Sequence, residues 1–164
     1  MLLLALFAIA AAGTAPSCPA PLVHTHANSL LPREFVEGSR WIAPQPKRLH
    51  AVMWSGRAVD GRFSIYAGGV NRATGIAEKI MWVVPARATH LSSSGMRIVW
   101  RRDGRRVVQR REGRIRSNSF RRLDQPEIYP SILVPPDPGC WKLRLRTGRI
   151  KATMYVIVQP SPTR

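Results

Sequence analysis

The chain has 164 residues, and 26 lysine and arginine residues against 9 acidic residues give it a formal net charge of +17. This length has room for one domain with a well-buried core and argues against a multidomain organisation. So positive a chain is expected to be attracted to polyanions, among them nucleic acid, anionic glycans, and the phosphate-bearing polymers and lipids of a cell envelope.

Residues 1–13 predict an export signal. An unbroken apolar run from Leu2 to Ala12 is followed by small residues up to Gly13, where a signal peptidase could cut. The run is too short to cross a bilayer, so no membrane span is expected after its removal. The alternatives are a buried apolar strand or an N-terminal membrane anchor.

Cys18 and Cys140 are the only two cysteines. Export would place them where disulfides persist, so we expect them to pair. The bridge would close a loop of about 120 residues and stabilise the fold by about 4–5 kcal/mol in the chain-entropy model. Two free buried thiols are the alternative.

Residues 14–46 read as an extended, proline-containing arm with at most a short strand at Arg40-Trp41-Ile42. The arm contains His24-Thr25-His26, whose two imidazoles would project to one side of an extended chain and could chelate copper or zinc. Two ligands are too few for a complete site, and solvated loop histidines are the alternative reading.

Apolar and polar residues alternate with period two through residues 47–160, which predicts an all-β domain, followed by a short tail at 161–164. About nine short strands separated by turn residues are typical of an antiparallel β-sandwich. The expected strands are Arg48–Ser55, Gly61–Ala67, Lys79–Val84, Met96–Arg102, Arg105–Arg110, a weak Ser117–Leu123, Glu127–Val134, Trp141–Arg146 and Arg149–Val158.

Two glycine-containing turns predict hairpins. Asp103-Gly104 stands between two strand-like runs, which is a strong hairpin signal. Thr147-Gly148 joins the last two expected strands. If those two residues form the loop, the facing pairs are Leu145 with Ile150, Leu143 with Ala152, and Trp141 with Met154.

This register has a consequence for Cys140. Trp141, Leu143 and Leu145 share the core face, so Cys140, Lys142, Arg144 and Arg146 point the other way. We therefore expect the bridge to hold the arm against the outer side of the strand and not inside the core, unless Gly139 introduces a bulge.

The segment from Arg101 to Arg122 is rich in arginine, and on a hairpin alternate arginines would form a basic ridge able to bind phosphate or sulfate groups. There are two alternative explanations for the many arginines. Solvated or edge strands often carry charge, and arginine codons are favoured in GC-rich DNA. The candidate anion-binding residues are Arg101, Arg102, Arg105, Arg106, Arg110, Arg111, Arg114 and Arg116.

Recognised catalytic motifs are missing from the sequence: there is no Gly-x-Ser-x-Gly, no His-Glu-x-x-His and no glycine-rich phosphate loop. The nine carboxylates are scattered singly, which gives no support to a paired-carboxylate hydrolase. The chain is therefore expected not to be an enzyme and to need no cofactor, and its tryptophans are expected in the core.

Four blocks resemble those of a group of short, uncharacterised bacterial secreted or surface proteins. They are Ser17-Cys18-Pro19, Met81-Trp82, Asp103-Gly104-Arg105-Arg106, and Pro130-Ser131-Ile132-Leu133-Val134 with Gly139-Cys140-Trp141. The likeness covers mainly the two ends of the chain. It implies an immunoglobulin-like sandwich with the two cysteines joined, and it implies no activity.

These observations predict a secreted, periplasmic or surface-exposed bacterial protein with an immunoglobulin-like antiparallel β-sandwich and an irregular N-terminal arm. We expect an envelope interaction module that contacts anionic polymers or a partner protein, with nucleic acid disfavoured by export. The alternatives are a small copper- or zinc-handling protein that uses His24 and His26, and a cell-wall hydrolase.

Overall fold

The structure is a computed structural model that describes residues 18–26, 40–46, 49–53, 57–84, 96–111 and 127–163. The side chains of Arg110, Arg111 and Glu127 are not part of this description. The predicted signal at 1–13 and the weak strand predicted at Ser117–Leu123 lie outside the described residues.

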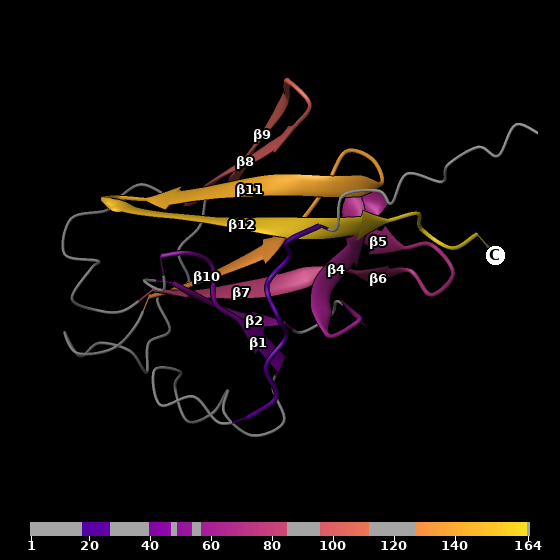
Figure 1. Cartoon of the computed structure of the whole chain (residues 1–164), viewed down its shortest axis with the longest axis horizontal. Coiled ribbons are helices and arrows are strands. Elements are labelled where there is room, and N and C mark those ends of the chain that lie inside the picture. Colours follow the sequence, from indigo (N-terminus) through magenta and orange to yellow (C-terminus); the bar gives the residue numbers. More distant parts are fainter. Residues whose placement is uncertain are drawn as a thin grey trace, which may run out of the picture.

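The first of two large sheets has four strands in the order β1-β2-β7-β10, all antiparallel. It lies below β11 and β12 in Figure 1. Its strands are β1 (Arg40–Ile42), β2 (His50–Met53), β7 (Lys79–Val84) and β10 (Glu127–Ile132).

The second sheet has six strands in the order β3-β4-β12-β11-β8-β9. Neighbouring strands are antiparallel except β12 and β4, which run parallel, so the sheet is mixed. A separate two-stranded ribbon pairs β5 (Val70–Asn71) with β6 (Ile76–Ala77). The six strands are β3 (Arg57–Val59), β4 (Arg62–Tyr66), β8 (Met96–Arg102), β9 (Arg105–Arg111), β11 (Gly139–Thr147) and β12 (Ile150–Gln159).

One apolar core lies between the two large sheets. It is built from the alternate residues that each strand turns inward, and three tryptophans, Trp82, Trp100 and Trp141, are completely buried in it. Burial on this scale is the main favourable term in folding. The all-β sandwich predicted from the sequence is therefore confirmed, and so is the core position of these three tryptophans.

The four-stranded sheet is buried on its outer side as well. A second apolar cluster there contains Trp41, Val52, Met81, Val83 and Ile128. The strands β2 and β7 consequently have nearly continuous runs of buried residues, HAVM and KIMWVV. A sheet with both faces covered is expected to show such runs instead of alternation.

Most predicted strands are present with small differences at their ends. The predicted bounds of Arg40–Ile42, Lys79–Val84 and Met96–Arg102 coincide with β1, β7 and β8. The sequence prediction missed β3, β5 and β6, which have only two or three residues and show little alternation, although β1 is equally short.

The predicted register of the last hairpin is wrong by two residues. Leu145 pairs with Ala152, Leu143 with Met154, and Trp141 with Val156, because the strands continue to Thr147 and Ile150 around a Gly148-Arg149 turn. A two-residue shift preserves the faces of a strand. Trp141, Leu143 and Leu145 are buried as predicted, and Arg144 and Arg146 are exposed.

The predicted disulfide between Cys18 and Cys140 is present, with the two Cα atoms 5.4 Å apart. Cys140 lies on the side of β11 opposite to Trp141 and is only partly buried, so the bridge is outside the core, as the register argument predicted. Beyond Cys18 the arm makes single bridges, Leu22 to Arg62 and His24 to Trp41, and otherwise has no strand before β1 among the described residues. Within the same residues, no helix is long and apolar enough to cross a membrane.

Candidate anion-binding site

The outer face of the six-stranded sheet gathers basic side chains from four neighbouring strands. In β11 the residues between the buried Trp141, Leu143 and Leu145 are Lys142, Arg144 and Arg146, which point away from the core. The same alternation in β8 buries Met96, Ile98 and Trp100 and directs Arg97, Val99 and Arg101 outward. Strand alternation alone therefore places these cations on one surface.

Strand pairing then brings the cations into two rows across the sheet. In one row Lys142 faces Arg101, which faces Arg106 of β9. In the other row Arg146 faces both Arg97 of β8 and Lys151 of β12. Because neighbouring strands are about 4.8 Å apart and four residues span about 13 Å, each row is about 10 Å long and the rows lie about 13 Å apart.

Arg144 lies midway between the two rows, opposite Val99 on one side and Thr153 on the other. The rows and Arg144 border an open depression with a volume of about 420 Å³. We call this depression the basic groove. Its lining residues are Arg97, Val99, Arg101, Arg106, Lys142, Arg144, Leu145, Arg146, Lys151, Ala152 and Thr153.

The basic groove holds seven cations and no carboxylate. Among the described residues, the ion pairs all involve Arg102 or Arg105, and none reaches a groove residue. The Nε atom of Arg97 is buried and has no hydrogen-bond partner there. Like charges on directly opposed strand positions destabilise a sheet, so the groove concentrates positive potential that an incoming anion would relieve.

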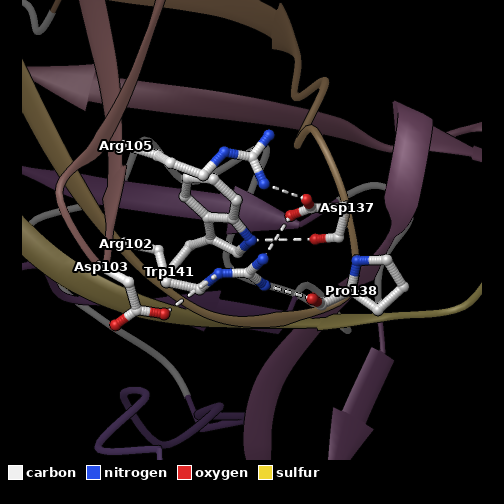
Figure 2. A network of polar contacts seen from close by, with 6 residues as sticks. All are labelled: Arg102, Asp103, Arg105, Asp137, Pro138 and Trp141. Atoms are coloured by element: carbon white, nitrogen blue, oxygen red, sulfur yellow. Dashed lines mark hydrogen bonds and ion pairs between the residues drawn. The ribbon is translucent and has the colours of Figure 1, made fainter.

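Arg102 and Arg105 pair with each other and lie on the face of the β8–β9 hairpin opposite to Arg101 and Arg106. Figure 2 shows both arginines beside Trp141 and Asp137. Arg102 forms an ion pair with Asp137 at 2.9 Å, donates to the carbonyl oxygen of Pro138, and stacks with its Cζ 4.6 Å from the centre of the Trp141 ring. Arg105 pairs with the other carboxylate oxygen of Asp137, and its Cζ is 5.7 Å from the same ring. The indole Nε1 of Trp141 donates to the carbonyl oxygen of Asp137 at 2.9 Å. We call Arg102, Arg105, Asp137 and Trp141 the Trp141 clamp.

Gly139 makes room for this clamp. Its φ of +135° is a conformation that side chains rarely adopt, and a Cβ atom there would collide with the Arg102 guanidinium. With Asp137 bonded to both arginines, the clamp fixes the β8–β9 turn to the loop that precedes β11. Arg102 and Arg105 therefore have a structural role, which is to connect this turn to that loop.

The eight arginines proposed from the sequence fall into three groups. Arg101 and Arg106 line the basic groove, whereas Arg102 and Arg105 belong to the clamp. Arg110 and Arg111 are in β9, but their side chains are outside the description, as are all atoms of Arg114 and Arg116. Anion binding by these residues stays a prediction.

Sequence reasoning missed Arg97 and Lys151 as members of this surface. The signal for Arg97 was its spacing of four residues from Arg101 in one strand, which places both on one face. Lys151 faces outward in either register, opposite Arg144 in the predicted one and opposite Arg146 in the structure.

His24 and His26 lie at Trp41, far along the chain from the groove residues. Their ring centres are 5.2 Å apart, and the His24 ring stacks on the indole at 4.3 Å. The indole Nε1 of Trp41 donates to the carbonyl oxygen of His26 at 2.9 Å. The described part of the chain has no group of three or more His, Cys, Asp or Glu residues able to hold a metal ion. Metal binding by His24 and His26 stays a prediction.

Neither a family model, nor a curated protein, nor a solved structure matches this chain. Its functional interpretation therefore depends on the geometry described above.

Proposed function

We propose that this protein is an exported, non-catalytic interaction module that holds anionic envelope polymers in its basic groove. The observation that carries the proposal is the convergence of seven cations from β8, β9, β11 and β12 on one open depression without a carboxylate among them. Arginine suits this task because its planar guanidinium donates two parallel hydrogen bonds to a phosphate, sulfate or carboxylate group.

The rigidity of the sheet supports the proposal. The groove cations are on paired strands, so their Cα positions are fixed before any ligand arrives. A preorganised set of charges loses less conformational entropy on binding than the same charges on a loop. The opposed cations also repel one another in the free protein, and a bound polyanion would remove that repulsion.

The chemistry of the bridge supports the proposed location. A disulfide between Cys18 and Cys140 persists in oxidising compartments such as the periplasm or the cell exterior. The apolar run that begins at Leu2 is consistent with export. A basic module in that location would meet the phosphate, sulfate or carboxylate groups of envelope polymers.

The test is salt-dependent retention of the mature chain on heparin and phosphocellulose resins. The double variant R144Q/R146Q removes two groove charges, whereas the matched double variant R72Q/R149Q removes two exposed charges outside the groove. We expect R144Q/R146Q to elute at clearly lower salt and to lose about tenfold in affinity per arginine. The control variant should elute close to the wild type.

Equal losses in the two double variants would contradict the proposal, because the attraction would then depend only on net charge. Circular dichroism and thermal unfolding of each variant establish that the sandwich is intact. The four substituted arginines are exposed, so the fold is expected to persist.

A further inference from the structure

The arrangement of charge within the basic groove restricts the shape of its ligand. Lys142, Arg144 and Arg146 follow one another along β11, and alternate residues of a strand are about 7 Å apart. This line of three cations runs through the middle of the charged surface, because β11 lies between β8 and β12. A single compact anion could contact one of the three positions, but it could not span the line of about 13 Å.

Each end of this line is reinforced by cations from neighbouring strands. Arg101 lies beside Lys142, and both Arg97 and Lys151 lie beside Arg146. The middle position has only Arg144, since its cross-strand neighbours are Val99 and Thr153. The pattern is therefore three anion positions in sequence, with the strongest at the two ends.

The surfaces between the anion positions are aliphatic or small. The outward neighbours of Arg144 are Val99 and Thr153, whereas Leu145 and Ala152 are buried in the core. One aromatic ring, that of Tyr155, lies opposite Lys142, whose Nζ is 5.6 Å from the ring centre. Proteins that hold single-stranded nucleic acids stack the bases on aromatic side chains. The single ring of Tyr155 is already in contact with Lys142 and is not a series of rings for successive bases, whereas an aliphatic linker between charged groups can lie against Val99 and Thr153.

A membrane surface is a poorer match than a single chain. The charged surface is hollowed, and a flat bilayer would not reach its floor. Membrane-binding faces also present large apolar side chains beside their cations. Of the exposed large apolar side chains among the described residues, only Val108 of β9 lies on this face.

The geometry points to a linear polymer of aliphatic units joined by phosphodiester groups, lying along β11 with successive phosphates at Lys142, Arg144 and Arg146. This inference rests on the proposed function and names the class of polymer. Each phosphate carries one negative charge and two free oxygens, which a guanidinium can bind in a bidentate manner. The aliphatic units lie beside Val99 and Thr153, on either side of Arg144.

The test measures binding of synthetic oligo(glycerol phosphate) with one, two, four and eight repeats by fluorescence anisotropy at about 50 mM NaCl. We expect affinity to rise steeply from one to four repeats, because three phosphates fill the groove. From four to eight repeats it should rise only by the number of ways in which the longer chain can place three phosphates there. R144Q should lower the affinity of the tetramer about tenfold and leave the single repeat unchanged, since one phosphate can use the ends of the line. The control variant R72Q should change neither.

Salt dependence gives an independent count of the phosphates bound. Three contacted phosphates on a single chain predict a slope of log K against log salt of about −2, and loss of one contact in R144Q reduces its size by about 0.7. An oligothymidylate, a sulfated heparin oligosaccharide and phosphatidylglycerol vesicles are compared under the same conditions. All three are expected to bind more weakly than the tetramer.

The outcomes separate this inference from the proposed function. If no polyanion binds in a manner that depends on Arg144 and Arg146, the proposed function itself fails. If polyanions bind the groove but affinity does not depend on the number of repeats, only the present inference fails. Tighter binding of oligothymidylate, heparin oligosaccharide or vesicles with the same dependence on Arg144 would also overturn it and would identify that class as the ligand.

Discussion

Glu78 is a carboxylic acid buried next to the sandwich core, with only 3 % of its surface exposed. It accepts a hydrogen bond from the backbone N–H of Tyr66, and among the described residues its Oε2 atom has no partner. Desolvation raises the pKa of Glu78 above its ordinary value of 4.5, although the Tyr66 hydrogen bond and the charges of Arg57 and Arg40 act in the opposite direction.

This burial predicts how stability changes with pH. The folded state holds its proton to higher pH than the unfolded state, so ionisation of Glu78 favours unfolding. The contribution of Glu78 to stability is complete below pH 4.5 and is lost as the pH rises through the raised pKa of the folded state. The variant E78Q keeps a neutral acceptor for Tyr66 and should unfold at higher denaturant concentration than the wild type at pH 7.

The difference between E78Q and the wild type should shrink toward zero as the pH falls to about 4, which denaturant titrations at several pH values can measure. The variant D60N, at an exposed turn position, serves as the control and should show no such trend. A constant difference at every pH would show that the effect of E78Q is steric and not linked to ionisation.

The neighbouring arginines of the β8–β9 hairpin show how far residue-level prediction can go. Arg101 and Arg102 are adjacent, yet one lines the groove and the other belongs to the Trp141 clamp. The sequence prediction had placed Arg101, Arg102, Arg105 and Arg106 in a single anion-binding set, and the structure divides them. Deciding which set faces inward required Trp100, which shares its face with Arg102 and is buried. The role of Asp137 could not be predicted, because it comes from a loop distant in sequence.

At the scale of elements, the turn dipeptides specified hairpins to different degrees. Asp103-Gly104 connects its strands as predicted, with both residues at positive φ, 46° and 76°, as the favoured two-residue hairpin turn requires. The sequence Thr-Gly is less specific. Thr147 pairs with Ile150, and its hydroxyl donates to the Tyr129 hydroxyl at 3.2 Å inside the sandwich. That contact between the sheets extends the hairpin by one pair beyond the prediction.

Gln109 is the polar connection between the edge strand β9 and the chain that leaves β10. Its Nε2 donates to the carbonyl oxygen of Ile132, and its Oε1 accepts from the backbone N–H of Val134 at 3.2 Å and from Trp100 Nε1 at 3.3 Å. One side chain therefore bonds to β8 of the six-stranded sheet and, at two points, to the chain at the end of β10 in the four-stranded sheet. The sequence placed Gln109 in an expected strand and did not indicate these contacts.

Replacing Gln109 with Leu should destabilise the fold by about 2–3 kcal/mol, because it removes the three hydrogen bonds of this partly buried group. Urea unfolding followed by tryptophan fluorescence measures the change. V108T, at the exposed neighbouring position, is the control and should alter stability by less than about 0.5 kcal/mol. A Q109L variant as stable as the wild type would show that water replaces these contacts.

At the scale of the whole molecule, the Cys18–Cys140 bridge joins positions 122 residues apart. It fixes the start of the arm to β11, and the backbone bonds from Val23 to Gly61 and from Phe63 to Pro21 continue the attachment to β4. The six-stranded sheet is closed in a similar way, because the parallel pairing of β12 with β4 joins the last strand to an early one. The disulfide was predicted from the two cysteines, whereas the pairing of β12 with β4 was not predicted.

The double variant C18S/C140S should lose about 4–5 kcal/mol of stability, the loop-closure entropy that the bridge removes from the unfolded chain. Guanidinium denaturation of the variant, and of the wild type with and without reductant, measures this loss. Reduced wild type and C18S/C140S should agree. An unchanged denaturation midpoint would mean that the arm is held by its backbone bonds alone.

The Trp141 clamp divides the β8–β9 hairpin into an anchored side and a free side. Arg102, Arg105 and Asp137 join the hairpin to the loop before β11 through contacts that use none of the groove side chains. The outward-facing residues of these strands, which alternate with the buried ones, can be substituted without changing the buried residues. The exposed side chains of the hairpin could therefore change, and with them the ligand, while the sandwich keeps its structure.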